Sequence, residues 1–332
     1  MTEFRIVTFG GGTGHYTLLR GLVEQNRPES VTAVPSTWDD GGSSGRLRTE
    51  MGVLPQGDAR QCLLALMTSD EQRQVAQQLF NDRFASERGP LKGHSLGNLI
   101  FARLERTFQG QDRGLEAARI LFKVKSKIIP PTLTNTILIA KTKKGVIIEG
   151  ETNVDHRKKR EDFDPKDRIS RLYFDTKADA NPQALHEISK ADVLIFSSGD
   201  LYTSILPHLL ISGIQEGILS SKAKLFFIVN LMTKAGETDF YKASDHIEVF
   251  LHYLGDPKRL NYIVVNENRI DKKVINQYRE ESQELVKIDA ERIHKLAAKS
   301  RILKAPMALY FPKEHLLRHN PEVLASTILK AA

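Results

Sequence analysis

The stretch F-R-I-V-T-F-G-G-G-T-G, residues 4–14, decides the fold. An apolar run enters a series of glycines, and an amphipathic segment follows from Tyr16 to Gln25, which predicts a strand, a glycine loop and a helix. Backbone N–H groups in such a loop can approach an anion, and the helix dipole favours negative charge there. The loop therefore predicts a phosphate or nucleotide site. The alternative is a tight turn that needs positive φ.

The spacing of these glycines does not specify the nucleotide. Gly10 and Gly12 fit the dinucleotide pattern G-x-G-x-x-G, but His15 stands where the third glycine should be. No lysine follows in the manner of an ATP-binding P-loop. An NAD-dependent oxidoreductase is accordingly disfavoured.

Strand and helix patterns alternate along most of the chain. Predicted strands follow the first one at residues 31–37, 192–196, 225–231 and 262–265. Predicted helices include 59–67, 71–84, 115–122, 182–189, 202–210, 244–254, 272–284 and 321–329. The helix at 244–254 has Ser244 or Asp245 as its predicted cap. Alternation of this kind is typical of an α/β protein with a Rossmann-like, doubly wound, mostly parallel sheet. Ligands of such sheets bind at the carboxyl ends of the strands, which is where the glycine-rich loops are predicted to lie.

The period changes in the middle of the chain. Residues 136–141 and 146–149 are two β runs around Lys143-Lys144-Gly145, a hairpin signal, and 169–174 is a third run. We therefore expect one domain over residues 1–332, with a small, β-rich α/β subdomain inserted at about residues 132–176.

Composition restricts the class of protein. The chain has 332 residues, 40% apolar and 27% charged, as expected of a globular fold with a packed core. The single cysteine, Cys62, lies in an apolar helical pattern and is predicted to be in the core. The start of the sequence shows no secretory signal, and residues 201–215 are too short for a membrane span, so we expect a cytoplasmic protein.

The net charge is +7, and the basic residues are mixed with acidic residues along the sequence rather than concentrated in one part of it. The densest basic cluster, residues 156–160, is followed at once by four acids, and a solvated loop or a contact to a phosphate-bearing small ligand would each explain it. We expect no nucleic-acid partner.

A second polar stretch follows the second strand: W-D-D-G-G-S-S-G-R, residues 38–46. It has little to bury, so we predict a loop rather than a helix interior. Its two acids can bind a hard cation or a hydroxyl group, and its serines and arginine can donate to phosphate. The alternative is a plain flexible loop.

Three further stretches could contribute to a polar cleft. Asp58 is either the cap of the helix at 59–67 or a ligand group, and Arg60 is a cation in the first turn, where the dipole disfavours it. His94 and Asn98 stand at another helix start. S-S-G-D-L-Y-T-S, residues 197–204, follows a predicted strand and is a second candidate phosphate loop. No G-x-S-x-G elbow supports nucleophilic catalysis.

Taken in order, these motifs resemble one family. F-G-G-G-T-G, D-D-G-G-S-S-G-R-L, P-Q-G-D-A-R, G-H-S-L-G-N-L, S-G-D-L-Y-T-S-I-L-P, N-L-M-T-K-A-G-E-T-D and L-L-R-H-N occur as in the YvcK-type gluconeogenesis factors of the CofD-like superfamily. The resemblance covers residues 4 to about 330 and implies a Rossmann-like core with an inserted subdomain.

The resemblance implies two functions. The YvcK-type branch is similar to a binding factor for UDP-sugars such as UDP-N-acetylglucosamine, associated with gluconeogenic growth, peptidoglycan precursor supply and cell shape. The CofD branch is a Mg²⁺-dependent transferase that moves phospholactate from a lactyl-diphosphonucleoside to a deazaflavin precursor, releasing GMP. We favour the binding factor. We keep the transferase as the alternative, with Mg²⁺ as its cofactor, and leave a homodimer open.

The resemblance also implies site residues. Asp40 matches the acid that would act in catalysis or hold Mg²⁺ in a transferase. The residues expected to bind the ligand are Gly11, Gly12, Thr13, Gly14, Asp39, Asp40, Ser43, Ser44, Arg46, Asp58, Arg60, His94, Asn98, Gly199, Tyr202, Thr203, Tyr278 and Arg318. Three residues depart from the family pattern. Trp38 could stack on a base or fill a gap, Asp200 adds a negative charge that weakens phosphate binding or requires a cation, and Phe240 replaces a glycine.

Overall fold

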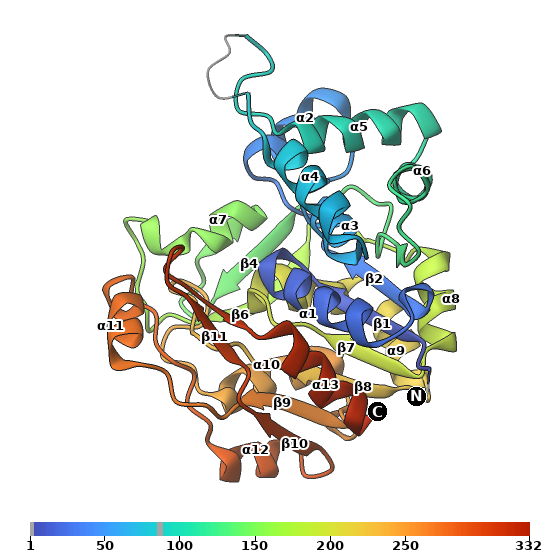
Figure 1. The fold of residues 1–332 in the computed structure, drawn as a ribbon. Coiled ribbons are helices and arrows are strands. Elements are labelled where there is room, and N and C mark those ends of the chain that lie inside the picture. The colour runs from blue at the N-terminus through green and yellow to red at the C-terminus, as the bar shows by residue number, and fades with distance from the viewer. Residues whose placement is uncertain (1–2, 85–88) are drawn as a thin grey trace.

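A seven-stranded parallel sheet runs through the computed structural model, which describes residues 3–84 and 89–332 (Figure 1). The strand order is β10-β9-β8-β7-β1-β2-β3, and each neighbouring pair is parallel. The strands are β1 (Ile6–Gly10), β2 (Val31–Pro35), β3 (Lys127–Ile128), β7 (Val193–Phe196), β8 (Lys224–Ile228), β9 (Tyr262–Asn266) and β10 (Arg301–Ala305). Helices cover both faces, so the predicted doubly wound α/β fold is confirmed.

The strand order reverses between β1 and β7. From β1 the chain builds outward to β2 and β3, and it then returns to place β7 on the other side of β1 and builds outward to β10. Ile6 of β1 accordingly pairs with Val31 on one side and Val193 on the other. The loops after β1 and β7 therefore separate at a topological switch point, where doubly wound sheets bind their ligands.

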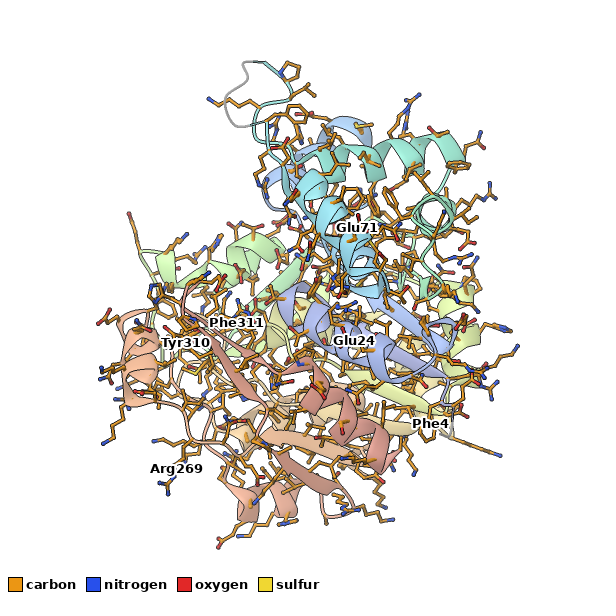
Figure 2. All side chains as sticks on the ribbon, in the orientation of Figure 1. Phe4, Glu24, Glu71, Arg269, Tyr310 and Phe311 are labelled. Carbon is orange, nitrogen blue, oxygen red and sulfur yellow. The ribbon has the colours of Figure 1, made fainter. Side chains whose placement is uncertain are left out.

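Alternating side chains divide the core between the two faces of the sheet. In β7, Val193 and Ile195 face one hydrophobic cluster, and Leu194 and Phe196 face the other. The first cluster packs under α1 (Gly12–Gln25), α3 (Gly57–Leu66) and α13 (Pro321–Ala331). The second includes α8 (Pro182–Lys190), α9 (Ile214–Ser220) and α10 (Ala243–Leu254). Side chains fill the space on both faces of the sheet (Figure 2).

The predicted hairpin forms a separate three-stranded antiparallel sheet. Its order is β5-β4-β6, from β4 (Leu138–Thr142), β5 (Ile147–Glu149) and β6 (Ile169–Phe174). Gly145 makes the turn at φ +91° and donates its N–H to the Thr142 carbonyl oxygen at 3.1 Å. The short helix α7 (Glu151–Asp155) follows β5 directly. Leu138 and Ala140 join this sheet to one of the two main core clusters.

The polar stretch at 38–46 is not a loop throughout, so that prediction is wrong. The chain turns at Gly42, with φ +47°, and residues from Gly42 to Met51 form the helix α2. Leu47 is the reason, because it is buried against Val53 and Ala102. Tertiary packing of a few apolar side chains thus outweighs the weak helix propensity of glycine and serine.

The chain segment between β2 and β3 forms a group of helices on one side of the molecule (Figure 1). Besides α2 and α3 it contains α4 (Asp70–Asn81), α5 (Leu96–Phe108) and α6 (Gln111–Leu121). The predicted α-helix at 202–210 is instead a π turn, Leu201–Ile205, followed by a 3-10 turn, Leu206–Leu210. Pro207 supplies no N–H to the regular ladder there, and the ring nitrogens of His208 face the Ile205 and Val34 carbonyl oxygens.

The C-terminal part contains elements that the patterns did not predict. They are β10, α12 (Ala290–Leu296) and the hairpin of β11 (Ala308–Phe311) and β12 (Leu316–His319), next to the predicted α11 (Lys272–Glu280).

Lys242, rather than Ser244 or Asp245, takes the cap position of α10, and the Asp245 carboxylate accepts its N–H at 2.8 Å. No helix in residues 3–84 and 89–332 is long and apolar enough to cross a bilayer.

Candidate functional site

A pocket of about 150 Å³ opens at the switch point. We call it the switch-point pocket. Its walls come from the start of α1, from the loops after β7 and β8, from α11 and the residues after it, and from β12. It is lined by Thr13, Gly14, Thr17, Ser198, Gly199, Asp200, Asn230, Leu231, Met232, Thr233, Lys234, Tyr278, Gln283, Leu317, Arg318 and His319. The carboxyl ends of three neighbouring strands therefore meet the C-terminal hairpin at one site.

Gly14 lets the first turn of α1 touch the loop after β7. A Cβ on Gly14 would lie 1.6 Å from the Ser198 carbonyl oxygen, so a larger residue would force α1 and that loop apart. Gly12 stands at φ +61°, the left-handed region that favours glycine, and begins α1. These two requirements place the start of α1 against the pocket, as the glycine loop predicts.

Asn230 fixes the second loop. Its amide nitrogen donates to the Gly199 carbonyl oxygen at 2.7 Å, and its amide oxygen accepts the Gly199 N–H at 3.3 Å. The pair fixes Gly199 next to the Gly11 carbonyl oxygen, which a Cβ on Gly199 would meet at 3.4 Å, and the neighbouring Ser198 lines the pocket. A polar wall of backbone and hydroxyl groups of this kind suits an anionic ligand.

Tyr278 of α11 and Arg318 and His319 of β12 close the pocket on the C-terminal side. The Tyr278 hydroxyl accepts the Leu317 N–H at 2.7 Å, which fixes α11 to β12, and Arg318 lies on the pocket wall. His319 Nδ1 lies 3.2 Å from the Ser198 hydroxyl. Burial lowers the pKa of His319 to about 4, so its ring is neutral at pH 7. Its Nε2 has no hydrogen-bond partner among the described residues.

The Asp58 side chain reaches from the first turn of α3 to the glycine loop. Its Oδ1 accepts the Gly12 N–H at 2.8 Å, and a Cβ on Gly11 would meet its Oδ2 at 2.3 Å. Gln56, not Asp58, takes the cap position of α3, so the capping prediction is wrong. Burial raises the pKa of Asp58 to about 6, the Gly12 N–H opposes that rise, and the Asp39 carboxylate adds to it.

The two acids that follow β2 have different contacts. Asp39 Oδ1 accepts the Gly41 N–H at 2.9 Å, and burial raises the pKa of this carboxyl. Asp40 Oδ1 accepts the Thr152 N–H at 2.9 Å and so holds the first turn of α7. Next to Thr152, burial raises the pKa of Glu151 to about 10, and the Asp39 carboxylate adds to the rise. Acids from the stretch after β2 and from α7 therefore lie near one another.

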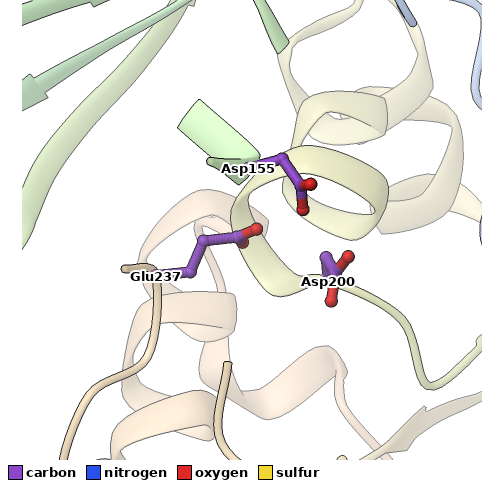
Figure 3. A group of neighbouring side chains, drawn as sticks. All are labelled: Asp155, Asp200 and Glu237. Atoms are coloured by element: carbon purple, nitrogen blue, oxygen red, sulfur yellow. The ribbon is translucent and has the colours of Figure 1, made fainter. Parts of the chain in front are cut away.

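Three carboxylates converge next to the pocket, and we call them the carboxylate triad: Asp155, Asp200 and Glu237. They come from α7, from the loop after β7 and from the loop after β8, and they point toward one another (Figure 3). One oxygen of each lies within 4.8 Å of the others. The Lys234 ammonium joins them, 2.6 Å from Asp155 Oδ1 and 3.2 Å from Asp200 Oδ2.

Several predicted residues interlock elements instead of lining the pocket. Ser43 pairs with His94 at 3.0 Å, while Asn98 contacts Ser44 at 3.4 Å and accepts from Arg60 at 3.0 Å, which ties α2, α3 and α5 together. The Arg46 guanidinium donates to the Pro90 and Lys92 carbonyl oxygens.

Tyr202 and Thr203 support the carboxylate triad. The Tyr202 N–H and the Thr203 hydroxyl donate to the two carboxylate oxygens of Glu237 at 3.0 and 3.1 Å. The Tyr202 side chain is buried and its hydroxyl pairs with the Tyr241 hydroxyl. Five predicted residues line the pocket itself: Thr13, Gly14, Gly199, Tyr278 and Arg318.

The structure decides two of the questions raised by the unusual residues. Trp38 is fully buried and donates its indole N–H to the Thr203 carbonyl oxygen at 2.6 Å, so it fills the core and does not stack on a base. Lys234 is the cation next to Asp200. Phe240 adopts φ +61°, a conformation that favours glycine.

Sequence reasoning missed Ser198, Asn230, Lys234 and His319 as pocket residues. Position could have identified them, because each lies in or next to a quoted motif and three of them follow β7 or β8 at its carboxyl end. Asp155 carried no such signal. It lies among the mixed charges around residues 156–160, where Arg157 is buried against Asp167 and the neighbouring Lys158 and Lys159 are exposed.

Comparison with known proteins agrees with this architecture. Residues 6–305 match the family described as 2-phospho-L-lactate transferase CofD. The gluconeogenesis factor of Halalkalibacterium halodurans is 36% identical over 334 residues, covering 99% of this chain and 97% of that protein. The gluconeogenesis factor of Bacillus subtilis is 32% identical over 326 residues, covering 98% and 97%.

A solved structure has the same fold. The crystal structure of a UPF0052 family member from Bacillus halodurans superposes with a TM-score of 0.88 at 34% identity, over 98% of this chain and 99% of that one. Both the family match and the relatives extend across nearly the whole sequence. The chain belongs to the CofD family, among relatives that are gluconeogenesis factors.

Proposed function

We propose that the chain is a binding factor for a nucleotide sugar, such as UDP-N-acetylglucosamine, linked to gluconeogenic growth, peptidoglycan precursor supply and cell shape. The switch-point pocket carries the proposal. It lies at the carboxyl ends of β1 and β7, where doubly wound sheets bind nucleotides. The names of the relatives support the link to gluconeogenesis.

The groups on the pocket wall suit the diphosphate of such a ligand. Arg318 supplies a permanent positive charge, Thr13 and Ser198 supply hydroxyl groups, and Gly14 stands in the first turn of α1. At about 150 Å³ the pocket encloses only part of a nucleotide sugar, so the remainder would extend along the cleft toward Asp39 and Asp58.

Ligand binding tests the proposal directly. Thermal shift and calorimetry with UDP-N-acetylglucosamine, UDP-glucose, GDP and NAD, with and without Mg²⁺, should show stabilisation by a UDP-sugar that grows with its concentration. Arg318→Ala should weaken this binding at least about tenfold, because it removes a charge-assisted hydrogen bond. Arg269→Ala is the matched control, since Arg269 is exposed away from the pocket (Figure 2). No shift with any UDP-sugar at millimolar concentration would refute the proposal.

The alternative is a Mg²⁺-dependent transferase that acts on a lactyl-diphosphonucleoside, with Asp40 as its catalytic or metal-binding acid. The matching family's description favours it, and so does the gathering of Asp39, Asp58 and Glu151 near the glycine loop. Release of GMP from a lactyl-diphosphonucleoside in the presence of a deazaflavin acceptor would establish this activity. Absence of GMP from a protein that binds a UDP-sugar would leave the binding factor.

A further inference from the structure

The carboxylate triad has the chemistry of a divalent cation site. Three carboxylates with oxygens within 4.8 Å of one another, beside the pocket proposed for a diphosphate, offer the hard oxygen ligands that Mg²⁺ takes in proteins. The transferase branch of the family would require such an ion. The question is whether the residues around the triad leave room for it.

Lys234 already occupies the position between the acids. Its ammonium lies 2.6 Å from Asp155 Oδ1 and 3.2 Å from Asp200 Oδ2. The third acid is also engaged, because both oxygens of Glu237 accept hydrogen bonds from residues 202 and 203. Mg²⁺ needs near-octahedral ligands at about 2.0–2.1 Å. The triad does not fit Mg²⁺ while Lys234 stays in place.

The charge on Lys234 is secured by its surroundings. Burial by itself disfavours the ammonium, but the carboxylates of Asp200 and Glu237 outweigh that effect and raise the pKa of Lys234 above its ordinary value. The side chain is therefore a fixed cation at neutral pH. It compensates the negative charge that Asp200 brings to the loop after β7.

Lys234 also faces the proposed ligand. It lines the switch-point pocket together with Gly199 and Asn230, and 29% of its side chain is exposed. Two of its three N–H groups can serve Asp155 and Asp200, and among residues 3–84 and 89–332 the ammonium has no further hydrogen-bond partner. One N–H thus remains for an oxygen of a bound phosphate.

We propose that Lys234 takes the place of a divalent cation at the carboxylate triad, so that this chain binds a diphosphate group in the switch-point pocket without Mg²⁺. The ligand rests on the function proposed above, but the replacement of the cation does not. Asp155 and Asp200 are positioning residues that hold the ammonium. Without Lys234 the carboxylates of Asp155 and Asp200 would repel a diphosphate and would be free to bind a metal ion.

The first test is the Mg²⁺ dependence of ligand affinity. Calorimetry with UDP-N-acetylglucosamine should give the wild type the same affinity in EDTA and in millimolar Mg²⁺. Lys234→Met should bind at least about tenfold more weakly in EDTA and recover part of the loss in Mg²⁺. Lys234→Arg, which keeps the charge, should remain independent of Mg²⁺. Lys158→Met is the control, since that exposed ammonium donates to the Glu281 carbonyl oxygen.

The second test needs no nucleotide. Electron paramagnetic resonance should detect a Mn²⁺ ion bound to Lys234→Met that is absent from the wild type and lost again in Lys234→Met/Asp200→Asn. Thermal melting of each variant checks that it is folded. A Mn²⁺ ion on the wild type that Asp155→Asn or Asp200→Asn removes would overturn the proposal.

The two tests separate the failure of each proposal. A wild type that binds a UDP-sugar only with Mg²⁺, or a Lys234→Met variant with unchanged affinity in EDTA, contradicts the role of Lys234 and leaves the binding function intact. A wild type that binds no UDP-sugar in either buffer contradicts the binding function. The Mn²⁺ measurement then still decides whether Lys234 replaces the cation.

Discussion

At the scale of the residue, Asp58 shows how a buried charge in the site lowers the stability of the folded protein. Its carboxylate lies beneath the glycine loop, where burial raises its pKa from an ordinary 3.8 to about 6. A raised pKa means that the folded protein holds the proton more tightly than the unfolded chain does. The stability from this preference is therefore complete below pH 3.8 and is lost as the pH rises through about 6.

Replacing Asp58 by Asn should accordingly stabilise the protein at pH 7.5. The asparagine can still accept the Gly12 N–H but carries no charge to bury. We expect Asp58→Asn to gain about 1–3 kcal/mol over the wild type at pH 7.5 and nothing near pH 4, measured by urea unfolding across this range.

Asp179→Asn is the control, because that side chain is exposed and its substitution should change little at either pH. A gain for Asp58→Asn that is the same at pH 4 and pH 7.5 would show that the charge on Asp58 is not the cause.

The sequence could predict some site residues and not others for a physical reason. Gly14 and Arg318 belong to contiguous motifs. A glycine loop after a strand can be recognised from the few residues that form it. The contact of Lys234 with Asp155 joins segments 79 positions apart across two sheets, and nothing local signals it. Sequence reasoning placed a cation near Asp200 as one alternative but could not name it.

At the scale of the element, the structure attaches α7 to the acidic stretch. Asp40 accepts the Thr152 N–H in the first turn of α7, and α7 carries Glu151 toward Asp39 and Asp155 toward Asp200 and Glu237. A helix of five residues has little stability alone, so this contact helps to fix it. The same feature explains why α7 and the start of α2 escaped prediction, since tertiary contacts rather than propensity form both.

Asp40 therefore allows a test of positioning against chemistry. Asp40→Ala should loosen α7, raise hydrogen exchange in residues 150–155 and weaken UDP-sugar binding, at a cost of about 1–2 kcal/mol in stability. Asp40→Asn keeps an oxygen acceptor for the Thr152 N–H and should retain both exchange protection and binding.

The opposite pattern would favour the transferase. If Asp40→Asn leaves α7 protected but abolishes GMP release from a lactyl-diphosphonucleoside, the charge of Asp40 acts in chemistry or holds Mg²⁺. If Asp40→Asn loses UDP-sugar binding as fully as Asp40→Ala does, positioning is not its main role.

At the scale of the whole molecule, α13 completes one face of the sheet. It packs closely on α1, and a Cβ on Gly21 would meet the Pro321 carbonyl oxygen at 2.0 Å. Ile328 is fully buried in this contact. A helix near the end of the chain thus stabilises the helix that begins at the glycine loop.

Ile328→Ala should lower the free energy of unfolding by about 2–5 kcal/mol, because it leaves a cavity in a close-packed core. Ile120→Ala is the matched control. This residue is 63% exposed, so the loss should stay within about 0.5 kcal/mol. Equal losses by urea unfolding would mean that α13 does not pack on α1 as described.

The topology of the sheet was predictable, whereas its full extent was not. Alternating strands and helices indicate parallel strands, and the pattern around residues 143–145 indicates an antiparallel pair. The edge strands β3 and β10 were missed. β3 is only two residues long, and residues 127–131 were interpreted only as the stretch that ends the predicted helix at 115–122. Edge positions lack the continuous apolar signal of the buried central strands.

The shortness of β3 has a consequence for behaviour at high concentration. An open sheet edge can recruit a strand from another molecule, which is a common route to aggregation. At the edge formed by β3, the two strand residues are followed by Ile129, whose N–H is paired with the Ala33 carbonyl oxygen. Pro130 and Pro131 come next and have no N–H to donate. At the other edge, β10 carries Arg301 and Lys304, and charges at such positions oppose the approach of a second strand. The fold thus keeps a long parallel sheet while leaving intermolecular strand addition few places to begin.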